Sequence, residues 1–261
     1  MKSFLKFLLG ASLIATIIVA VVFYITSGLT TTADKFFNAV AGNRYEQAYQ
    51  YVSQEFRDAT PPDQLAVFLE RNGLTDYQDA SWSERSFSGY RGKLVGTIHT
   101  RNGRSIPVRV HLVKSNGHWL VDSIFKPRSG VGGSADRNVP SQRDQIALVH
   151  ATMAEFANAI EGNDFSSFYA SVSARMRKQH SQQDVHKAFK AFVDRRFKLK
   201  VLNTMTPLFD KQAAVDSHGL LELIGHYPSQ PSLKFKLDYV YEGTRWKLTG
   251  IDIKIPAAKP E

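Results

Sequence analysis

Residues 36–57, which read FFNAVAGNRYEQAYQYVSQEFR, decide the fold because the chain contains this stretch twice. The second version is residues 156–177, FANAIEGNDFSSFYASVSARMR, and nine of the 22 positions are identical at an offset of 120 residues. Self-similarity at a fixed offset indicates one structural unit used twice. The sequence therefore predicts two domains of the same kind.

The similarity continues beyond these stretches at a second offset. Trp119 matches Trp246, and the alternating apolar residues of 106–112 match those of 233–239, all at an offset of 127 residues. The second copy therefore carries about seven extra residues, which fall after the equivalent of Leu69 and before these strand-like stretches. Insertions of this size normally lie in loops, and two domains of roughly 100 residues each have an ordinary size.

Composition narrows the function classes. The 261 residues include no cysteine, so disulfides, thiolate metal sites and cysteine-linked lipids are excluded. The net charge of +9 is spread over both copies rather than gathered in one stripe, so we do not expect a nucleic-acid partner. Neither a metal-ligand spacing nor a phosphate-binding loop occurs, and we expect no metal and no cofactor.

The N-terminus predicts a membrane anchor. Residues 7–25 contain no charged side chain, and a helix of that length spans nearly 30 Å, the thickness of a bilayer core. Lys2 and Lys6 precede the run, so we expect the N-terminus to stay in the cytoplasm and the rest of the chain to lie outside it, in the periplasm of a bacterial envelope. A cleaved signal peptide is the alternative, but its apolar region is normally shorter.

Each copy reads as helices followed by strands. In the first copy, Gly42-Asn43 ends a helix that Thr31 and Thr32 are expected to cap, and a helix then opens at Pro61-Pro62. Alternating apolar residues and the Asn-Gly turns at 102–103 and 116–117 indicate antiparallel strands. In the second copy we expect helices at 150–161, 165–169 and 182–194, and strands at 220–224, 233–241 and 246–253.

The predicted fold class is α+β, with about three helices packed on a curved antiparallel sheet in each domain. The predicted segments are a cytoplasmic stub with the anchor (1–30), a first domain (31–128), a flexible Gly- and Ser-containing linker (129–140), a second domain (141–256) and a tail (257–261).

The pattern Phe-x-x-Ala-[Val/Ile]-x-x-Gly-Asn-x-[Tyr/Phe]-x-x-x-Tyr, at 36–49 and again at 156–169, resembles the nuclear transport factor 2-like superfamily with its cone-shaped, cystatin-like fold. The resemblance covers both copies and implies two tandem cones behind the anchor. It implies little about function, because this superfamily includes isomerases, dehydratases, binding domains and secretion-system components.

Four aromatic residues recur in both copies: Tyr49, Tyr169, Trp119 and Trp246. They are candidate walls of a ligand pocket, but residues kept in both copies of a repeat usually define the core, and we favour that interpretation. The eight histidines are expected at the surface, with His111 facing outward from its strand. No catalytic residue is predicted.

Basic side chains gather at 175–200. We expect a helix there with an apolar stripe of Val185, Ala188, Phe189, Phe192 and Val193. Lys187 and Lys190 lie on its opposite face, with Arg195 and Arg196 after it, and Lys190 is spaced to pair with Asp194. This surface is either a solvated helix face or a contact for anionic lipid headgroups or an acidic protein partner.

The function we expect is a membrane-anchored envelope protein with a non-enzymatic binding or scaffolding role, for a protein partner or for an apolar small molecule held in a cone. Two alternatives remain open from the sequence. One is an isomerase- or hydratase-like enzyme in one cone, and the other is an inner-membrane assembly component of a secretion system.

Overall fold

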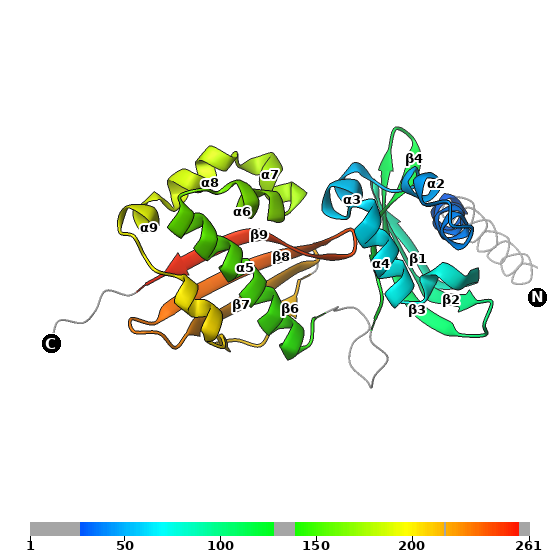
Figure 1. Cartoon of the computed structure of the whole chain (residues 1–261). Coiled ribbons are helices and arrows are strands. Elements are labelled where there is room, and N and C mark those ends of the chain that lie inside the picture. Colours follow the sequence, from blue (N-terminus) through cyan, green and yellow to red (C-terminus); the bar gives the residue numbers. More distant parts are fainter. Residues whose placement is uncertain (1–26, 128–138, 217, 256–261) are drawn as a thin grey trace, which may run out of the picture. The chain divides into compact units, whose positions relative to one another are not determined.

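The computed structural model describes residues 27–127, 139–216 and 218–255 of the chain. They divide into two compact units, with the boundary between Gly130 and Val131. Both units combine helices with an antiparallel sheet, so the α+β class is confirmed (Figure 1). The predicted anchor at 7–25, most of the predicted linker and the predicted tail lie outside the described residues. Within the described ranges no helix is both long enough and apolar enough to cross a membrane.

The first unit begins with its helices. Residues 27–41 are helical, so Thr31 and Thr32 lie inside this helix and the expected cap there is wrong. Asn43, with φ of 56°, takes the left-handed conformation that ends the helix, whereas Gly42 does not. Then follow α2 (Tyr45–Tyr49), α3 (Gln54–Ala59), α4 (Pro62–Arg71) and the 3₁₀ turn η1 (Leu74–Asp76).

The first sheet is a four-stranded antiparallel meander in the order β1-β2-β3-β4. Its strands are β1 (Tyr77–Ser88), β2 (Arg91–Thr100), β3 (Ser105–Ser115) and β4 (His118–Phe125). The two predicted Asn-Gly turns join β2 to β3 and β3 to β4. β1 was not predicted, because as an edge strand it has exposed polar residues where an internal strand would alternate clearly.

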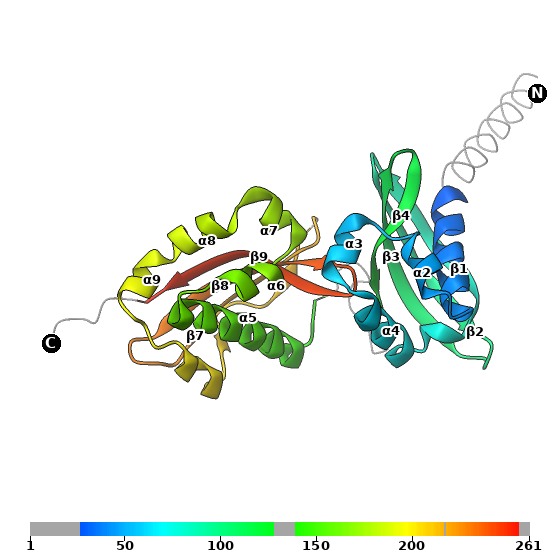
Figure 2. The same cartoon turned by 45° about the horizontal axis from the view of Figure 1, so that its top comes forward.

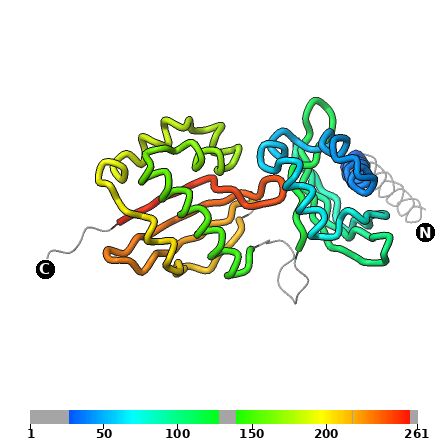
Figure 3. The backbone as a smooth tube through the Cα atoms, viewed as in Figure 1, coloured from blue at the N-terminus to red at the C-terminus, as the bar shows by residue number. Residues whose placement is uncertain are grey.

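The second unit repeats the order of helices before strands. Its helices are α5 (Gln142–Gly162), α6 (Ser166–Ser171), α7 (Ala174–Gln179), α8 (Gln182–Ala188), α9 (Lys190–Asp194) and the 3₁₀ turn η2 (Lys200–Thr204). Figure 3 traces α5, in green, across the sheet. This helix starts well before the expected residue 150, because the Ser141 hydroxyl caps it by accepting a hydrogen bond from the Asp144 N–H.

The single helix expected at 182–194 is wrong, since Phe189 interrupts it between α8 and α9 with φ of −106° and ψ of 10°. The Phe189 ring lies 4.8 Å from that of Phe156 in an edge-to-face contact. Ala188, expected in the apolar stripe, is exposed, whereas Val185 and Phe189 are buried.

The second sheet is also antiparallel. Three long strands, β7 (Leu220–Tyr227), β8 (Leu233–Glu242) and β9 (Arg245–Lys254), follow one another, and they agree with the three predicted strands. Two short strands, β5 (Leu208–Phe209) and β6 (Ala214–Val215), both pair with β7 at the edge. The 3₁₀ turn η2 is equivalent to η1 at the offset of 127, so the extra residues of the second copy fall between Phe189 and η2, in the segment that contains α9.

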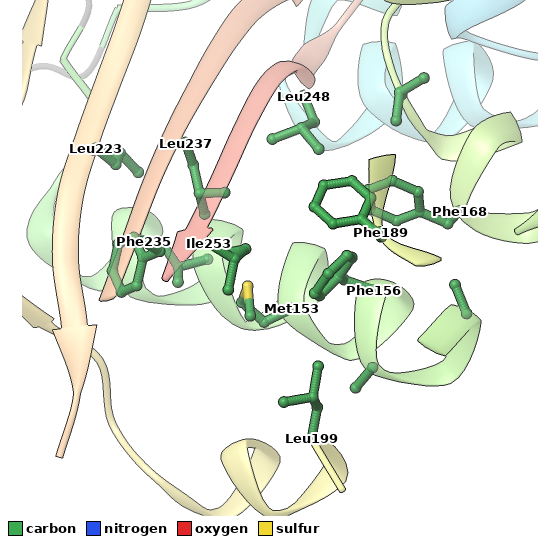
Figure 4. Close-up of a cluster of buried hydrophobic side chains, with 14 of the residues drawn as sticks. Met153, Phe156, Phe168, Phe189, Leu199, Leu223, Phe235, Leu237, Leu248 and Ile253 are labelled. Atoms are coloured by element: carbon green, nitrogen blue, oxygen red, sulfur yellow. The ribbon is translucent and has the colours of Figure 1, made fainter. Parts of the chain in front are cut away.

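Each unit has its own apolar core between the helices and the sheet. In the second unit Met153 and Phe156 of α5 face Leu223, Phe235 and Leu237 of the sheet (Figure 4). Burial of such side chains is the main favourable term in folding.

Candidate functional site

The two repeated tyrosines tie the short helices together. The Tyr49 hydroxyl donates a hydrogen bond to the carbonyl of Thr60. The Tyr169 hydroxyl donates to the carbonyl of His180 at 2.8 Å, and Thr60 and His180 are equivalent positions at the offset of 120. Both rings are half-buried against their cores. We interpret both tyrosines as residues that hold the short helices together rather than as walls of a ligand pocket.

The repeated serines join the same region to the sheet. Ser53 and Ser173 cap α3 and α7, each accepting a hydrogen bond from an N–H three residues later at 3.0 Å. Their own N–H groups donate to the carbonyls of Val121 and Leu248, both at 2.8 Å. These two acceptors are equivalent at the offset of 127. The shared Val-Ser therefore fixes where the helical layer meets the sheet.

The repeated tryptophans also pack against the cores. Trp119 is half-buried, and its carbonyl accepts a hydrogen bond from the Thr32 hydroxyl at 3.2 Å. Trp246 is half-buried and makes an edge-to-face contact with Tyr241, with ring centroids 5.3 Å apart. The four predicted aromatic residues therefore lie two in each unit, and all four pack against the core of their own unit.

The predicted basic surface, consisting of Lys187, Lys190, Arg195 and Arg196, is exposed in the second unit. Lys190 pairs with Asp194 at 2.6 Å as predicted, although both side chains are more than half exposed and such pairs contribute little stability. The other three form no ion pair among the described residues. Arg196 has φ of 50°, so the chain turns sharply after α9.

One polar pair was missed by the sequence interpretation. Asp34, on the helix at 27–41, accepts a hydrogen bond at 3.0 Å from the hydroxyl of Tyr77 on β1. Burial raises the pKa of this carboxyl, and the hydrogen bond from Tyr77 opposes the rise only in part. The available clue was the position of Asp34 among the buried Ala33, Phe36 and Phe37. This hydrogen bond holds the helix at 27–41 against the edge strand β1.

A repeated histidine was also missed. His99 and His226 are equivalent at the offset of 127, and each lies one residue before the end of its strand. His99 hydrogen-bonds with Ser81 at 3.1 Å, and His226 with Asp210 at 2.8 Å. Both contacts tie the edge of the sheet to its neighbouring strand. In the described part of the chain no group of three or more His, Asp or Glu residues could hold a metal ion.

His111 faces outward, as predicted, and is exposed on β3. Desolvation, together with the charges of Arg109, Lys93 and Arg91, lowers the pKa of His111 to about 4. Solvent screening at an exposed ring makes the effect on stability much smaller than in a buried site.

No protein-family model matches the chain, and no curated protein matches it. One solved structure, described as an "Ntf2 like protein involved in plasmid conjugation", is similar over 90% of this chain and 99% of that chain. The identity is 10% and the TM-score is 0.24, a similarity too low to carry an argument. The functional interpretation therefore depends on the residues described above.

Proposed function

We propose that the chain is a membrane-anchored envelope protein and that its two units are nuclear transport factor 2-like scaffolding domains for a protein partner. The apolar run at 7–25, preceded by Lys2 and Lys6, supports a single-pass anchor in the inner membrane with both units on the periplasmic side. Helices before an antiparallel meander in each unit, together with the repeated pattern, support two tandem domains of one kind.

The observation that carries the scaffolding role is how the repeated residues are used. The hydroxyl groups of the repeated tyrosines and serines and the N–H groups of the serines form hydrogen bonds that hold the helices to each other and to the sheet. The core beneath them in each unit consists of apolar side chains, part of which Figure 4 shows for the second unit. This packing favours a protein partner over an apolar small molecule inside a cone. The side chains left for recognition are those on the surface.

The basic surface of the second unit is our candidate for that contact. Lys187, Arg195 and Arg196 present three exposed positive charges without a paired carboxylate among the described residues, which suits an acidic protein surface or anionic lipid headgroups. Interactions between exposed charges are screened by salt. Binding through this surface should therefore weaken as the ionic strength is raised.

A photo-crosslinking amino acid placed at Lys187 or Arg195 of the full chain, in native membranes, tests this proposal. The matched control is Lys234, an exposed lysine on β8. We expect the first two positions to crosslink a protein that Lys234 does not reach. Crosslinks to lipid alone would show that the basic surface contacts lipid headgroups and not a protein partner. Identical crosslinking patterns at all three positions would refute a role for the basic surface.

Two other outcomes bear on the alternatives. Crosslinking to several envelope subunits of one machine would support the secretion-system alternative. The enzymatic alternative, an isomerase or hydratase, rests on Asp34, whose raised pKa suits a proton-transfer group. Asp34→Asn should lower the stability of the first unit if the hydrogen bond between Tyr77 and Asp34 stabilises the contact between helix and strand. An unchanged stability would show that the hydrogen bond with Tyr77 contributes little to the fold.

A further inference from the structure

Two hairpin tips lie at one end of the first unit. They are residues 85–91, RSFSGYR, which include the turn of the β1–β2 hairpin and the adjoining strand ends, and residues 114–119, KSNGHW, which do the same for the β3–β4 hairpin. The Lys114 N–H donates a 2.7 Å hydrogen bond to the carbonyl of Tyr90, so the two tips are joined. Figure 2 shows both tips at the same end of the sheet as the start of the helix at 27–41.

The hairpin tips expose aromatic residues beside cations. Tyr90 is 61% exposed and Phe87 is 43% exposed, which makes them two of the few large hydrophobic side chains at the surface. The Arg91 guanidinium lies 5.6 Å from the centre of the Tyr90 ring, and the Lys114 ammonium lies 5.8 Å from that of Trp119. Neither tip contains an acidic residue. Rings next to Arg or Lys characterise the membrane–water interface.

The helix that leads toward the apolar run is packed on these same tips. Leu29 is fully buried and lies so close to Gly92 that a Cβ at Gly92 would collide with its Cδ2. A Cβ added at Gly28 would lie 3.0 Å from Cδ1 of Trp119, and Thr32 donates to the Trp119 carbonyl. The start of the described chain is therefore fixed against the hairpin tips.

Chain length then limits how far the tips can lie from the membrane. Only four residue steps separate Ile25, the last residue of the apolar run, from Leu29. Four steps span at most about 14 Å. The headgroup layer on each side of a bilayer is roughly 5–8 Å thick. If the run spans the membrane, the tips are held at or just above the headgroups.

We propose that the hairpin tips dock on the lipid headgroup layer, with Tyr90 and Phe87 at the interface and Arg91 and Lys114 at the phosphates. This inference rests on the proposed anchoring. It adds that the first unit lies on the membrane in one orientation instead of swinging on its anchor. The opposite end of the sheet, at the β2–β3 turn, then points away from the bilayer.

The absence of cysteine allows a direct test with single labels on the full chain. Ser88→Cys in the β1–β2 tip and Arg101→Cys in the opposite turn each receive an environment-sensitive fluorophore. The protein is reconstituted in phosphatidylcholine vesicles with one third phosphatidylglycerol and with a spin-labelled lipid as quencher. We expect at least about twofold stronger quenching at Ser88 than at Arg101.

Variants in the Ser88→Cys protein then identify the groups responsible. Tyr90→Ser combined with Arg91→Glu should remove most of the difference in quenching, whereas Arg101→Glu, an equal charge change at the other end, should leave it unchanged. Equal effects of the two changes would show that overall charge, and not the tips, attracts the unit to the vesicle. Far-ultraviolet circular dichroism checks that the variants remain folded.

An alkaline carbonate wash separates the two levels of the proposal. If the full chain stays with the vesicles and Ser88 is quenched no more than Arg101, docking is wrong and anchoring stands. If the wash releases the chain, the anchoring is wrong and the docking falls with it. Retention together with strong quenching at Ser88 alone supports both.

Discussion

The two units differ most at the edge of their sheets. The first unit closes its sheet with one long strand, β1, of 12 residues, which pairs with β2 along its length with two register shifts. The second unit has β5 and β6, of two residues each, at the same edge. Edge strands pair on one side only, so their sequence is less constrained than that of internal strands.

The junction between helices and sheet differs least. Tyr49 and Tyr169 donate to equivalent carbonyls, Ser53 and Ser173 cap equivalent helices, and Asn43 and Asn163 both take left-handed backbone conformations. The comparison teaches that the copies retain the residues that connect layers and change those at the free edge. A shared residue in this chain is thus evidence for the fold rather than for a binding site.

The largest expected effect concerns the independence of the units. We expect residues 141–256 alone to fold with one cooperative thermal transition, because their core contains its own helices and sheet. Residues 27–128 should do the same. Calorimetry or circular dichroism on each fragment checks this. A fragment that melts without a transition would show that the two units depend on each other, and the comparison between them would lose its basis.

The second-largest effect is expected when a phenylalanine that both cores share is replaced by alanine. Phe36 and Phe156 are both fully buried, and replacing either by alanine should cost about 3–5 kcal/mol in its own unit. Phe156→Ala should be the costlier, because Phe168, Phe189 and Phe192 all contact its ring edge-to-face. Denaturant unfolding of the full chain measures both. A shift of both transitions by one substitution would contradict independent cores.

The repeated helix caps should have smaller effects. Ser173→Ala removes one cap bond from α7 and should cost about 1 kcal/mol. Ser53→Ala should cost more, up to about 2 kcal/mol, because its hydroxyl also donates to Asp122 at 2.8 Å. Replacing each serine by threonine, which keeps the hydroxyl, is the control. Equal losses in the two units would mean that the contact with Asp122 contributes nothing measurable.

The smallest expected effects on stability come from two equivalent positions, one a histidine whose pKa is lowered and the other an aspartate whose pKa is raised. His111 of the first unit corresponds to Asp238 of the second at the offset of 127. Because the pKa of His111 is about 4 in the folded unit and 6.5 in the unfolded chain, the unfolded chain binds this proton at a higher pH. The stability of the first unit therefore falls as pH decreases from about 6.5 toward 4. His111→Gln should flatten that decline in a series of melting curves.

Asp238 should respond with the opposite sign. Burial raises the pKa of its carboxyl, with Glu222 and Asp216 adding to the rise and Lys236 opposing it. The folded unit therefore holds this proton more tightly, and the contribution to stability present at low pH is lost as pH rises through the folded pKa. Asp238→Asn should raise the melting temperature of the second unit at pH 7 and have little effect near pH 3. A lower melting temperature at pH 7 would show that the charge is stabilised.

Several features of the fold could be read from the sequence. The repeat, the order of helices before strands and the Asn-Gly turns depend on local pattern, and local backbone preferences act within a few residues. The pairing of Lys190 with Asp194 and the outward position of His111 follow from the same periodicity. Such features need no knowledge of distant contacts.

Other features were decided only by tertiary structure. The helix that the sequence pattern supports is interrupted at Phe189, whose ring packs against Phe156, a residue 33 positions earlier in the chain. β1 exists because β2 offers it backbone partners, although its own residues are mostly polar. Asp34 and Tyr77 are 43 residues apart, and only the packing of a helix on an edge strand brings carboxyl and hydroxyl together. The physical reason is the same in each case: the free energy of these contacts comes from partners that local sequence does not contain.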